Sequence, residues 1–292
     1  MASQQDIKRR IRSVRNTRKV TKAMELVSGA KLRRAQVRIE ALRPFAAAMA
    51  ELIGEAAGRT HLPGQPLLER RDVTNTAILA LTGDRGLAGG FNANVLRTAF
   101  LEGRHELAAG RGVRWLAVGK KGAGTIRFRG YTIDRAWGGF TDRPSYQDAE
   151  AIAHHLIELY RNREVDRVVM VYNAFRSALA QEVVAAEILP VPIGEIAERS
   201  PKEIALEGTM LFEPEADAML GALLPAAVET AIYRALLESA ASEHGARMTA
   251  MRNASDNAEG LIDSYTLAMN RARQAEITQQ ILEVVAGADA LQ

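Results

Sequence analysis

The spacing of apolar side chains predicts a long helix at the start of the chain. Between Ser3 and Gly58 apolar residues recur mostly at intervals of three and four positions, as one face of a helix requires, in a stripe that drifts after Val14. In the first half of this stretch they are Ile7, Ile11, Val14, Val20, Met24, Val27 and Ala30. Pro44 lies inside the stretch and predicts a kink near Arg43, because proline removes a backbone hydrogen bond and crowds the preceding turn.

Short β-rich runs alternate with helical stretches between Thr74 and Ile193. The runs at 76–81 and 167–172 are nearly all apolar, which is typical of strands buried on both faces. Another strand is expected at 113–118 and a weaker one at 131–137, with helices at 92–109, 120–128 and 146–162. This alternation predicts an open, largely parallel α/β sheet. A last strand at 181–189 follows closely and should add antiparallel at an edge.

The C-terminal stretch carries the signature of a second long helix. No proline follows Pro225, and a helix over 226–286 would extend for roughly 90 Å. Its apolar positions follow heptad spacing at Met251, Ala258, Ile262, Tyr265, Met269 and Ala272. Two long terminal helices satisfy such seams most simply by pairing antiparallel.

The predicted fold is therefore of the α/β class, with a long antiparallel coiled coil of the terminal helices and a central open, Rossmann-like sheet. The expected domains are a helix at 1–58, an α/β domain with its linkers at 59–209, and a helix at 210–292.

The end of the second helix predicts a partner. In the stretch 271–286 apolar residues cover more than one narrow stripe, namely Ile277, Ile281, Leu282, Val284 and Val285. One partner helix cannot bury them all. A helix end that is apolar on several sides needs a surrounding sleeve of protein.

Composition excludes several classes of protein. Hydrophobic residues make up 47% of the 292 positions, which fits a packed core and excludes general disorder. The absence of cysteine excludes disulfides, thiolate zinc sites and a cysteine nucleophile. The longest uninterrupted apolar runs, such as Ala77–Leu81, are too short to cross a membrane, and the start lacks the apolar segment of a secretory signal.

Charge is distributed unevenly. Residues 1–43 hold 13 Lys or Arg and three acidic residues, whereas the remainder holds 25 basic and 32 acidic residues. A basic segment on a mildly acidic body indicates an acidic or polyanionic partner. Nucleic acid is one such partner, but bases such as Arg10, Lys19 and Arg33 surround the helix, and few aromatics are present to stack bases. A solvated face, or a face opposite acidic subunits, explains the charge as well.

No motif indicates an enzyme centre. The loop Gly83–Gly90 lies between a predicted strand and a helix, where glycine-rich loops hold phosphates, yet it matches neither phosphate-loop spacing and reads more simply as a tight turn. Gly119–Gly124 also lacks that spacing, and its lysines are expected at the surface. His154 and His155 point to different sides of a helix and cannot share a metal. We therefore expect no cofactor and no metal.

Four long motifs carry a resemblance to a known family. They are IKRRIRSVRNTRKVTKAMELVSGAKLRRAQ at 7–36, GDRGLAGGFNANV at 83–95, ARMTAMRNASDNA at 246–258, and NRARQAEITQQILEVVAGA at 270–288. In this order they closely resemble the γ subunits of F-type ATP synthases. The resemblance covers essentially the whole chain.

The resemblance implies a central rotor stalk that transmits torque and has no catalytic site. The terminal helices would lie inside a ring of alternating α and β subunits, and the α/β domain would bind the ε subunit and the membrane c-ring. Catalysis would belong to the β subunits. Membrane association would come only through partners, on the cytoplasmic face of a bacterial membrane, with no nucleic acid bound.

The resemblance also assigns residues. Met24 and Arg247 lie where the family's shaft contacts or braces the β-subunit lever, and Arg273, Gln274 and Thr278 lie in the collar and bearing near the tip. Acidic β-subunit loops would face the basic residues Arg9, Arg10, Arg12, Lys19 and Lys22.

Two positions depart from the family, because Gln280 replaces a common Glu and Ala88 replaces a frequent Cys. The alternative function is a stand-alone nucleotide-binding α/β enzyme with helical dimerisation arms.

Overall fold

The structure, a computed structural model, describes residues 4–59, 65–177, 180–192 and 216–289. It divides into two compact units. The sheet unit comprises Gly29–Ala246, and the paired-helix unit comprises Met1–Ser28 with Arg247–Gln292. Two long helices, α1 (Gln4–Arg59) and α6 (Ala216–Asp289), contribute to both units. The units therefore cut across the predicted domains 1–58 and 210–292.

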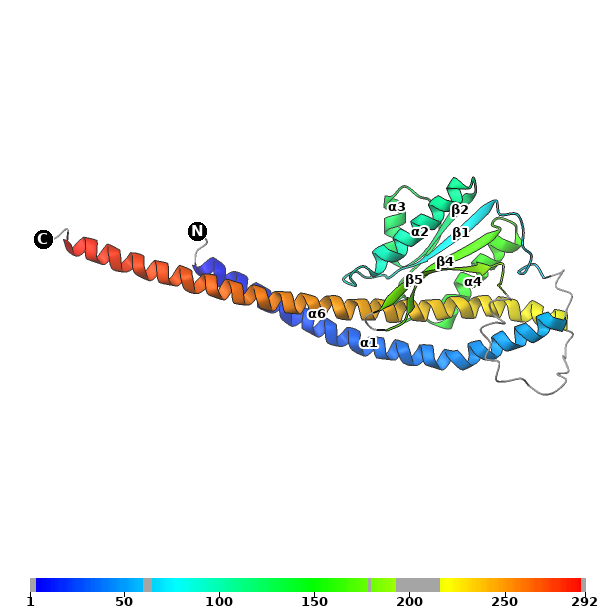
Figure 1. Cartoon of the computed structure of the whole chain (residues 1–292), viewed down its shortest axis with the longest axis horizontal. Coiled ribbons are helices and arrows are strands. Elements are labelled where there is room, and N and C mark those ends of the chain that lie inside the picture. Colours follow the sequence, from blue (N-terminus) through cyan, green and yellow to red (C-terminus); the bar gives the residue numbers. More distant parts are fainter. Residues whose placement is uncertain (1–3, 60–64, 178–179, 193–215, 290–292) are drawn as a thin grey trace. The chain divides into compact units, whose positions relative to one another are not determined.

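The sheet unit contains a five-stranded sheet in the order β3-β2-β1-β4-β5 (Figure 1). The strands are β1 (Asn75–Leu81), β2 (Gly112–Val118), β3 (Ile133–Trp137), β4 (Arg167–Phe175) and β5 (Gln181–Leu189). Strands β1 to β4 are parallel, and β5 pairs antiparallel with β4 at the edge. The predicted sheet, including its antiparallel edge strand, is confirmed.

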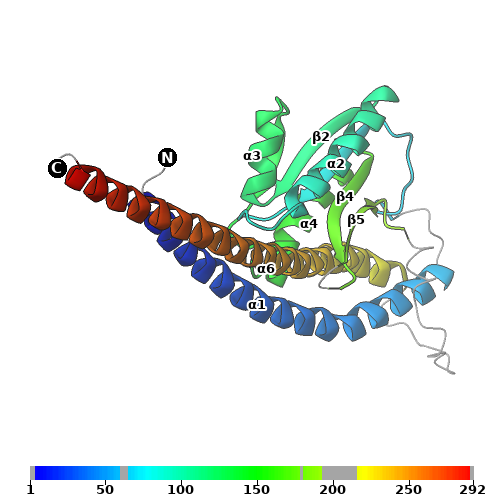
Figure 2. The ribbon, with the colours of Figure 1, turned by 60° about the vertical axis from the view of Figure 1, so that its left-hand side comes forward.

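Helices cover both faces of the sheet. Between the strands lie α2 (Phe91–Ala108), α3 (Lys120–Phe128) and α4 (Tyr146–Arg161), close to the predicted bounds. Helices α2 and α3 lie on one face, whereas α4 and the first part of α6 lie on the other (Figure 2). Strand β1 contributes to the core on both faces of the sheet. Ile78 points to the first face and Leu79 to the second, and both are fully buried. Burying one such side chain stabilises the fold by about 1.5–3 kcal/mol.

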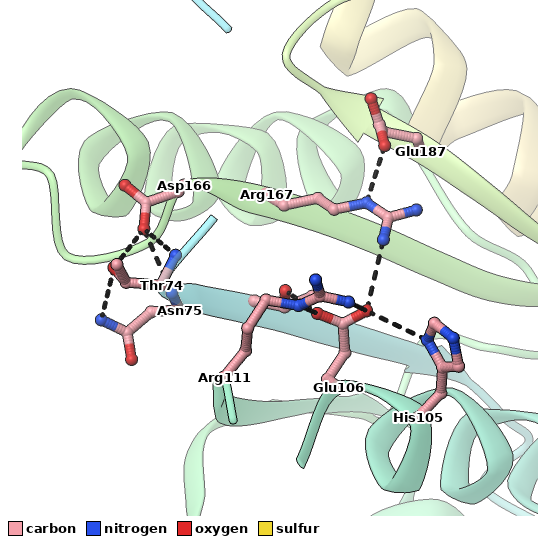
Figure 3. A network of polar contacts seen from close by, with 9 residues as sticks. Thr74, Asn75, His105, Glu106, Arg111, Asp166, Arg167 and Glu187 are labelled. Atoms are coloured by element: carbon pink, nitrogen blue, oxygen red, sulfur yellow. Dashed lines mark hydrogen bonds and ion pairs between the residues drawn. The ribbon is translucent and has the colours of Figure 1, made fainter. Parts of the chain in front are cut away.

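Two buried carboxylates secure the edge where β1 and β4 begin (Figure 3). Glu106 accepts hydrogen bonds from Thr76 Oγ1 at 2.7 Å and Arg111 Nε at 2.7 Å, and Arg167 Nη1 lies 3.3 Å away. Asp166 accepts hydrogen bonds from the Thr74 hydroxyl at 2.6 Å and from two backbone amides. Burial alone would raise the pKa of Glu106, but hydrogen bonds from Arg111 and Thr76 outweigh it and lower that pKa.

The C-terminal helix begins earlier than predicted. It starts at Ala216 rather than at 226 and runs through Pro225. Leu220, Leu224 and Val228, at intervals of four, are all buried in this stretch, and their burial offsets the hydrogen bond that proline cannot make. The predicted boundary at 209–210 lies outside the described residues. Helix α1 likewise continues through Pro44, and the kink there stays a prediction.

Within the paired-helix unit, α1 and α6 run antiparallel, as predicted (Figure 1). Arg18 pairs with Glu259, Thr21 meets Ser255 and Glu25 meets Arg252, so α6 numbers fall as α1 numbers rise. An apolar cluster holds the far end of the seam. It comprises Ile7, Ile11 and Ile262, with Val14, Tyr265, Met269 and Ala272 packed against it. All six predicted heptad positions of α6 are buried or half-buried.

The predicted stripe of α1 is wrong at three of its four positions after Val14, since only Met24 is half-buried. Val20 and Val27 are more than half exposed, and Ala30 is exposed too. The buried positions are instead Thr21, Glu25 and Ser28. These continue the heptad spacing of Ile7, Ile11 and Val14, because a seam between paired helices recurs every 3.5 residues whatever the polarity of the side chains.

One described helix resembles a membrane span by length and composition alone, and it lies within Met219–Ala286 of α6. Nearly half of its most apolar stretch is buried inside the protein. The core helix of a globular protein has the same property. The expectation that this chain itself does not cross a membrane stays a prediction.

Candidate partner-binding surface

The C-terminal part of α6 exposes apolar side chains on several sides. Beyond Ala272, every residue from Arg273 to Ala286 is exposed. The apolar ones are Ile277, Ile281, Leu282, Val284 and Val285, each between 48% and 72% exposed. Figure 1 shows α6 continuing past the start of α1, so no neighbouring helix of this unit covers this tip. Contiguous exposed apolar surface of this kind marks a binding site.

Further apolar side chains face outward where the helices are paired. Val20, Leu26 and Val27 on α1 and Leu261 and Leu267 on α6 are between 48% and 66% exposed. Several large apolar residues thus lie outside the seam, although polar residues such as Thr21 and Glu25 are buried in it. In an ordinary solvated coiled coil the outer positions are polar.

The predicted basic contacts lie at the surface of α1. Arg9, Arg10, Arg12 and Lys19 are exposed. Lys22 is exposed as well, but its Nζ donates to Glu25 Oε2 at 2.9 Å. Hydrogen bonds from Lys22 and Arg252 outweigh the effect of burial and lower the pKa of Glu25. Lys22 is therefore already engaged within the chain, whereas the other four present their charge to solvent.

The other predicted contact residues differ in accessibility. Met24 is half-buried beside the seam, and Arg247 is only 7% exposed. Near the tip, Arg273, Gln274 and Thr278 are exposed, and the Thr278 hydroxyl donates to the Gln274 carbonyl at 2.9 Å. At 1.5 Å per residue, Arg273 lies about 40 Å along α6 from Arg247, so these residues form two separate regions.

The sequence reasoning missed the polar part of the seam. Thr21 and Ser255 are buried, with their hydroxyls 2.7 Å apart, and Arg252 Nε donates to Glu25 Oε1 at 3.1 Å. The signal was present, because extending the heptad from Ile11 predicts positions 21 and 25. Apolar periodicity does not mark these positions, because both side chains are polar.

The glycine loop of the sheet unit acts as a structural joint. The Asp84 carboxylate accepts hydrogen bonds from Lys120 N at 3.1 Å, at the start of α3, and from Gly139 N at 2.7 Å. A carboxylate of the chain itself therefore occupies the position at which a helix start would hold a phosphate. A Cβ on Gly83 would lie 2.7 Å from a Glu243 oxygen, and Gly89 has a φ of +54°. The tight-turn interpretation fits both glycines.

The remaining candidates are surface features. Lys120 and Lys121 of the second glycine-rich turn are exposed, as predicted. His154 is exposed and lies 3.5 Å from Glu158, whereas His155 is half-buried against Trp137. Across the described residues, no cluster of three His, Asp or Glu side chains could hold a metal ion.

Comparison with known proteins decides the family. A family model described as ATP synthase matches residues 3–291. The ATP synthase gamma chain of Moorella thermoacetica is 43% identical over 291 residues, covering 100% of both chains. That of Rubrobacter xylanophilus is 44% identical over 291 residues, covering 100% of this chain and 99% of its own. The chain belongs to the ATP synthase gamma chain family.

Solved structures agree with this membership. The central stalk of the Tetrahymena thermophila mitochondrial ATP synthase matches with a TM-score of 0.61 and 25% identity, covering 81% of this chain and 99% of that one. A chain from the Euglena gracilis mitochondrial ATP synthase shares the fold, with a TM-score of 0.70 and 19% identity over 99% of this chain and 94% of its own. The gamma chain fold, a sheet with two long terminal helices, is thus confirmed, and so is the resemblance in the four sequence motifs.

Proposed function

We propose that this chain is the central rotor stalk of an F-type ATP synthase and transmits torque between the membrane c-ring and the catalytic α/β ring. The observation that carries the proposal is the tip of α6, whose apolar side chains face several directions and are all exposed. A sleeve of surrounding subunits would bury them. The family, and the central stalk that matches in Tetrahymena, support the same role.

The paired helices supply the asymmetry that such a role needs. An antiparallel pair of different sequences presents a different surface in every direction. A β subunit that meets the basic side of α1 gains contacts that a β subunit on another side does not. A rotating shaft shifts each site toward another conformation only by such differences in contact free energy.

The proposed contacts fall into two regions. Near the apolar end of the seam, Arg9, Arg10, Arg12 and Lys19 would face acidic β-subunit loops, with Lys22 held back by Glu25. Met24 would contact the β-subunit lever, and the buried Arg247 would brace the shaft. At the tip, Arg273, Gln274 and Thr278 would lie in the bearing.

In this role the chain is a non-catalytic subunit. The α and β subunits would surround the shaft, and the sheet unit would bind the ε subunit and the c-ring. The chain would be held at the cytoplasmic face of the bacterial membrane through these partners. The Asp84 carboxylate occupies the start of α3, the helix that follows the second glycine-rich turn, and argues against a phosphate site there.

Co-expression with the cognate α and β subunits tests the proposal. Native mass spectrometry should find one copy of this chain per six-subunit ring, and ATPase activity should be absent from the isolated chain. A chain shortened after Ala272 is the matched control, because it loses the tip and keeps the seam; it should fold but bind the ring weakly. Calorimetric binding of ATP, ADP or NAD to the isolated chain, without assembly, would contradict the proposal and favour the enzyme.

A further inference from the structure

Within the sheet unit, Asp142 lies between the two long helices. Its Oδ2 accepts a hydrogen bond from Lys31 Nζ of α1 at 2.5 Å. Its Oδ1 lies 3.7 Å from His244 Nε2 of α6, and its backbone carbonyl lies 3.3 Å from the same nitrogen. A single residue of the loop after β3 therefore contacts both helices.

The loop that carries Asp142 is fixed to the sheet. The neighbouring Thr141 is buried, and its hydroxyl donates to Asp84 Oδ2 at 3.0 Å and accepts from Asp84 N at 3.0 Å. Asp84 follows β1, and its carboxylate also binds the backbone at Lys120 and Gly139. Hydrogen bonds thus tie Thr141 to Asp84 at the end of β1, and Asp142 is the next residue along the chain.

Helix α6 is tightly packed at the same place. The His244 side chain is 2% exposed, and the preceding Glu243 is also buried. The Glu243 carboxylate lies so close to Gly83 that a Cβ there would lie 2.7 Å from it. The Ser242 hydroxyl donates to the Asn173 carbonyl at 3.3 Å. A twist of α6 against the sheet would therefore have to break polar contacts and close packing together.

The helix residues that Asp142 contacts lie near the two ends of the sheet unit in the sequence. Lys31 and His244 come just inside the sheet unit, whose bounds are Gly29 and Ala246. Beyond those residues both helices continue in the paired-helix unit. Asp142 therefore joins the sheet to α1 and α6 close to the points at which both enter the other unit.

We propose that Asp142 is a positioning residue that couples the sheet to both stalk helices, so that torque applied to the sheet unit reaches the shaft. The inference rests on the proposed function and adds to it the residue through which the load passes. The Lys31–Asp142 pair transmits torque to α1, and the His244–Asp142 contacts transmit it to α6.

The test uses the complete ATP synthase in inverted membrane vesicles, with ATP hydrolysis and ATP-driven proton pumping measured on the same preparation. Asp142→Asn keeps the shape of the side chain and removes its charge. It should leave assembly and ATP hydrolysis intact and lower the protons pumped per ATP by about twofold or more, the scale expected for a coupling residue remote from both sites. A residue that served only the stability of the fold would lower the amount of complex and leave this ratio unchanged.

Asp134→Asn is the matched control. Asp134 is also a partly exposed aspartate paired with a cation, with 35% of its side chain exposed against 41% for Asp142, but its partner Arg114 belongs to the sheet. This variant should pump like the wild type. Lys31→Gln should reproduce part of the loss while leaving the loop untouched. The exchange K31D/D142K re-forms the pair with α1 but not the contact with His244, so it should restore pumping in part.

Three outcomes separate the hypotheses. Wild-type pumping in both Asp142→Asn and Lys31→Gln overturns the inference and leaves the stalk function standing. A loss that the K31D/D142K exchange fails to restore even in part overturns the role of this ion pair. The stalk function itself is overturned if a complex assembled without this chain hydrolyses ATP and pumps protons as well as the complete complex does.

Discussion

The hydroxyl oxygens of Thr21 and Ser255 lie 2.7 Å apart in the buried seam between α1 and α6. Each hydroxyl also lies within hydrogen-bonding distance of a carbonyl of its own helix, at Arg18 and Met251 respectively. Since a hydroxyl has one hydrogen, one of the two donates across the seam and the other donates to its own helix. A buried polar pair of this kind specifies the register of paired helices.

Removing both of these hydroxyls should cost less than the sum of removing each alone. Thr21→Val and Ser255→Ala should each lower the free energy of unfolding by about 1 kcal/mol, because the remaining hydroxyl loses its partner in a buried site. The double variant should lose less than the sum of the two. Urea unfolding of the isolated chain, analysed as a double-mutant cycle, measures this coupling. Strict additivity of the single effects would show that the hydroxyls do not interact.

Glu25 should make stability depend on pH. Hydrogen bonds from Lys22 and Arg252 lower its pKa in the folded state below the ordinary 4.5. A depressed carboxyl pKa stabilises the fold above the unfolded-state value, and this contribution disappears as the pH falls through the folded-state pKa. Unfolding measured between about pH 6 and pH 3 should show a smaller loss of stability in Glu25→Gln than in the wild type. Glu259→Gln, which removes the exposed pair with Arg18, is the control and should follow the wild type.

The sheet unit should depend strongly on Glu106. Its side chain is 2% exposed and accepts hydrogen bonds from Thr76, Arg111 and Arg167. Glu106→Gln leaves the Arg111 guanidinium without its carboxylate and Arg167 with Glu187 alone, and should lower the free energy of unfolding by about 2–4 kcal/mol. Glu164→Gln, at an exposed carboxylate paired with Arg114, should cost less than about 1 kcal/mol. Thermal unfolding compares the two, and equal losses would contradict the importance of burial.

A charge placed on the tip should separate folding from assembly. Ile281→Glu and Leu282→Glu alter side chains that are 58% and 62% exposed, so the isolated chain should unfold within about 0.5 kcal/mol of the wild type. Binding to the α/β ring should nevertheless fall, because each carboxylate would be buried in the sleeve. Gln280→Glu adds the same charge at the preceding position and restores the residue common in the family, so it should assemble normally. Assembly of all three variants at wild-type level would contradict the buried tip.

Charge reversal on α1 tests the proposed electrostatic contacts. Replacing Arg9, Arg10 and Lys19 by Glu should lower ATP-driven proton pumping about two- to tenfold, as the loss of several partly exposed ion pairs implies. The effect should shrink with increasing salt, because screening weakens such pairs in the wild type as well. The same reversal at Arg97, Arg104 and Arg127, which are exposed in the sheet unit, controls for net charge. Unchanged pumping in the first variant would remove the electrostatic part of the proposal.

Much of the architecture followed from periodicity in the sequence. The repeat of three and four positions determined both terminal helices, and the short apolar runs determined the strands β1 and β4, because these patterns reflect which faces of an element are buried. The many-sided apolar tip also followed, since Ile277 and Ile281–Val285 cannot share one seam. Four sequence motifs determined the family, which the comparisons then confirmed.

Other features depended on residues far apart in the chain. Thr21 and Glu25 are buried in the seam, where they meet Ser255 and Arg252. Their polar character alone predicts exposed positions. Pro225 entered a helix because Leu220, Leu224 and Val228 are buried around it. The junction of Asp142 with Lys31 and His244 joins residues separated by about a hundred positions. A sequence pattern reports how much each face of a local element is buried, whereas the identity of the group that meets a buried polar side chain is decided only when the tertiary structure brings the two together.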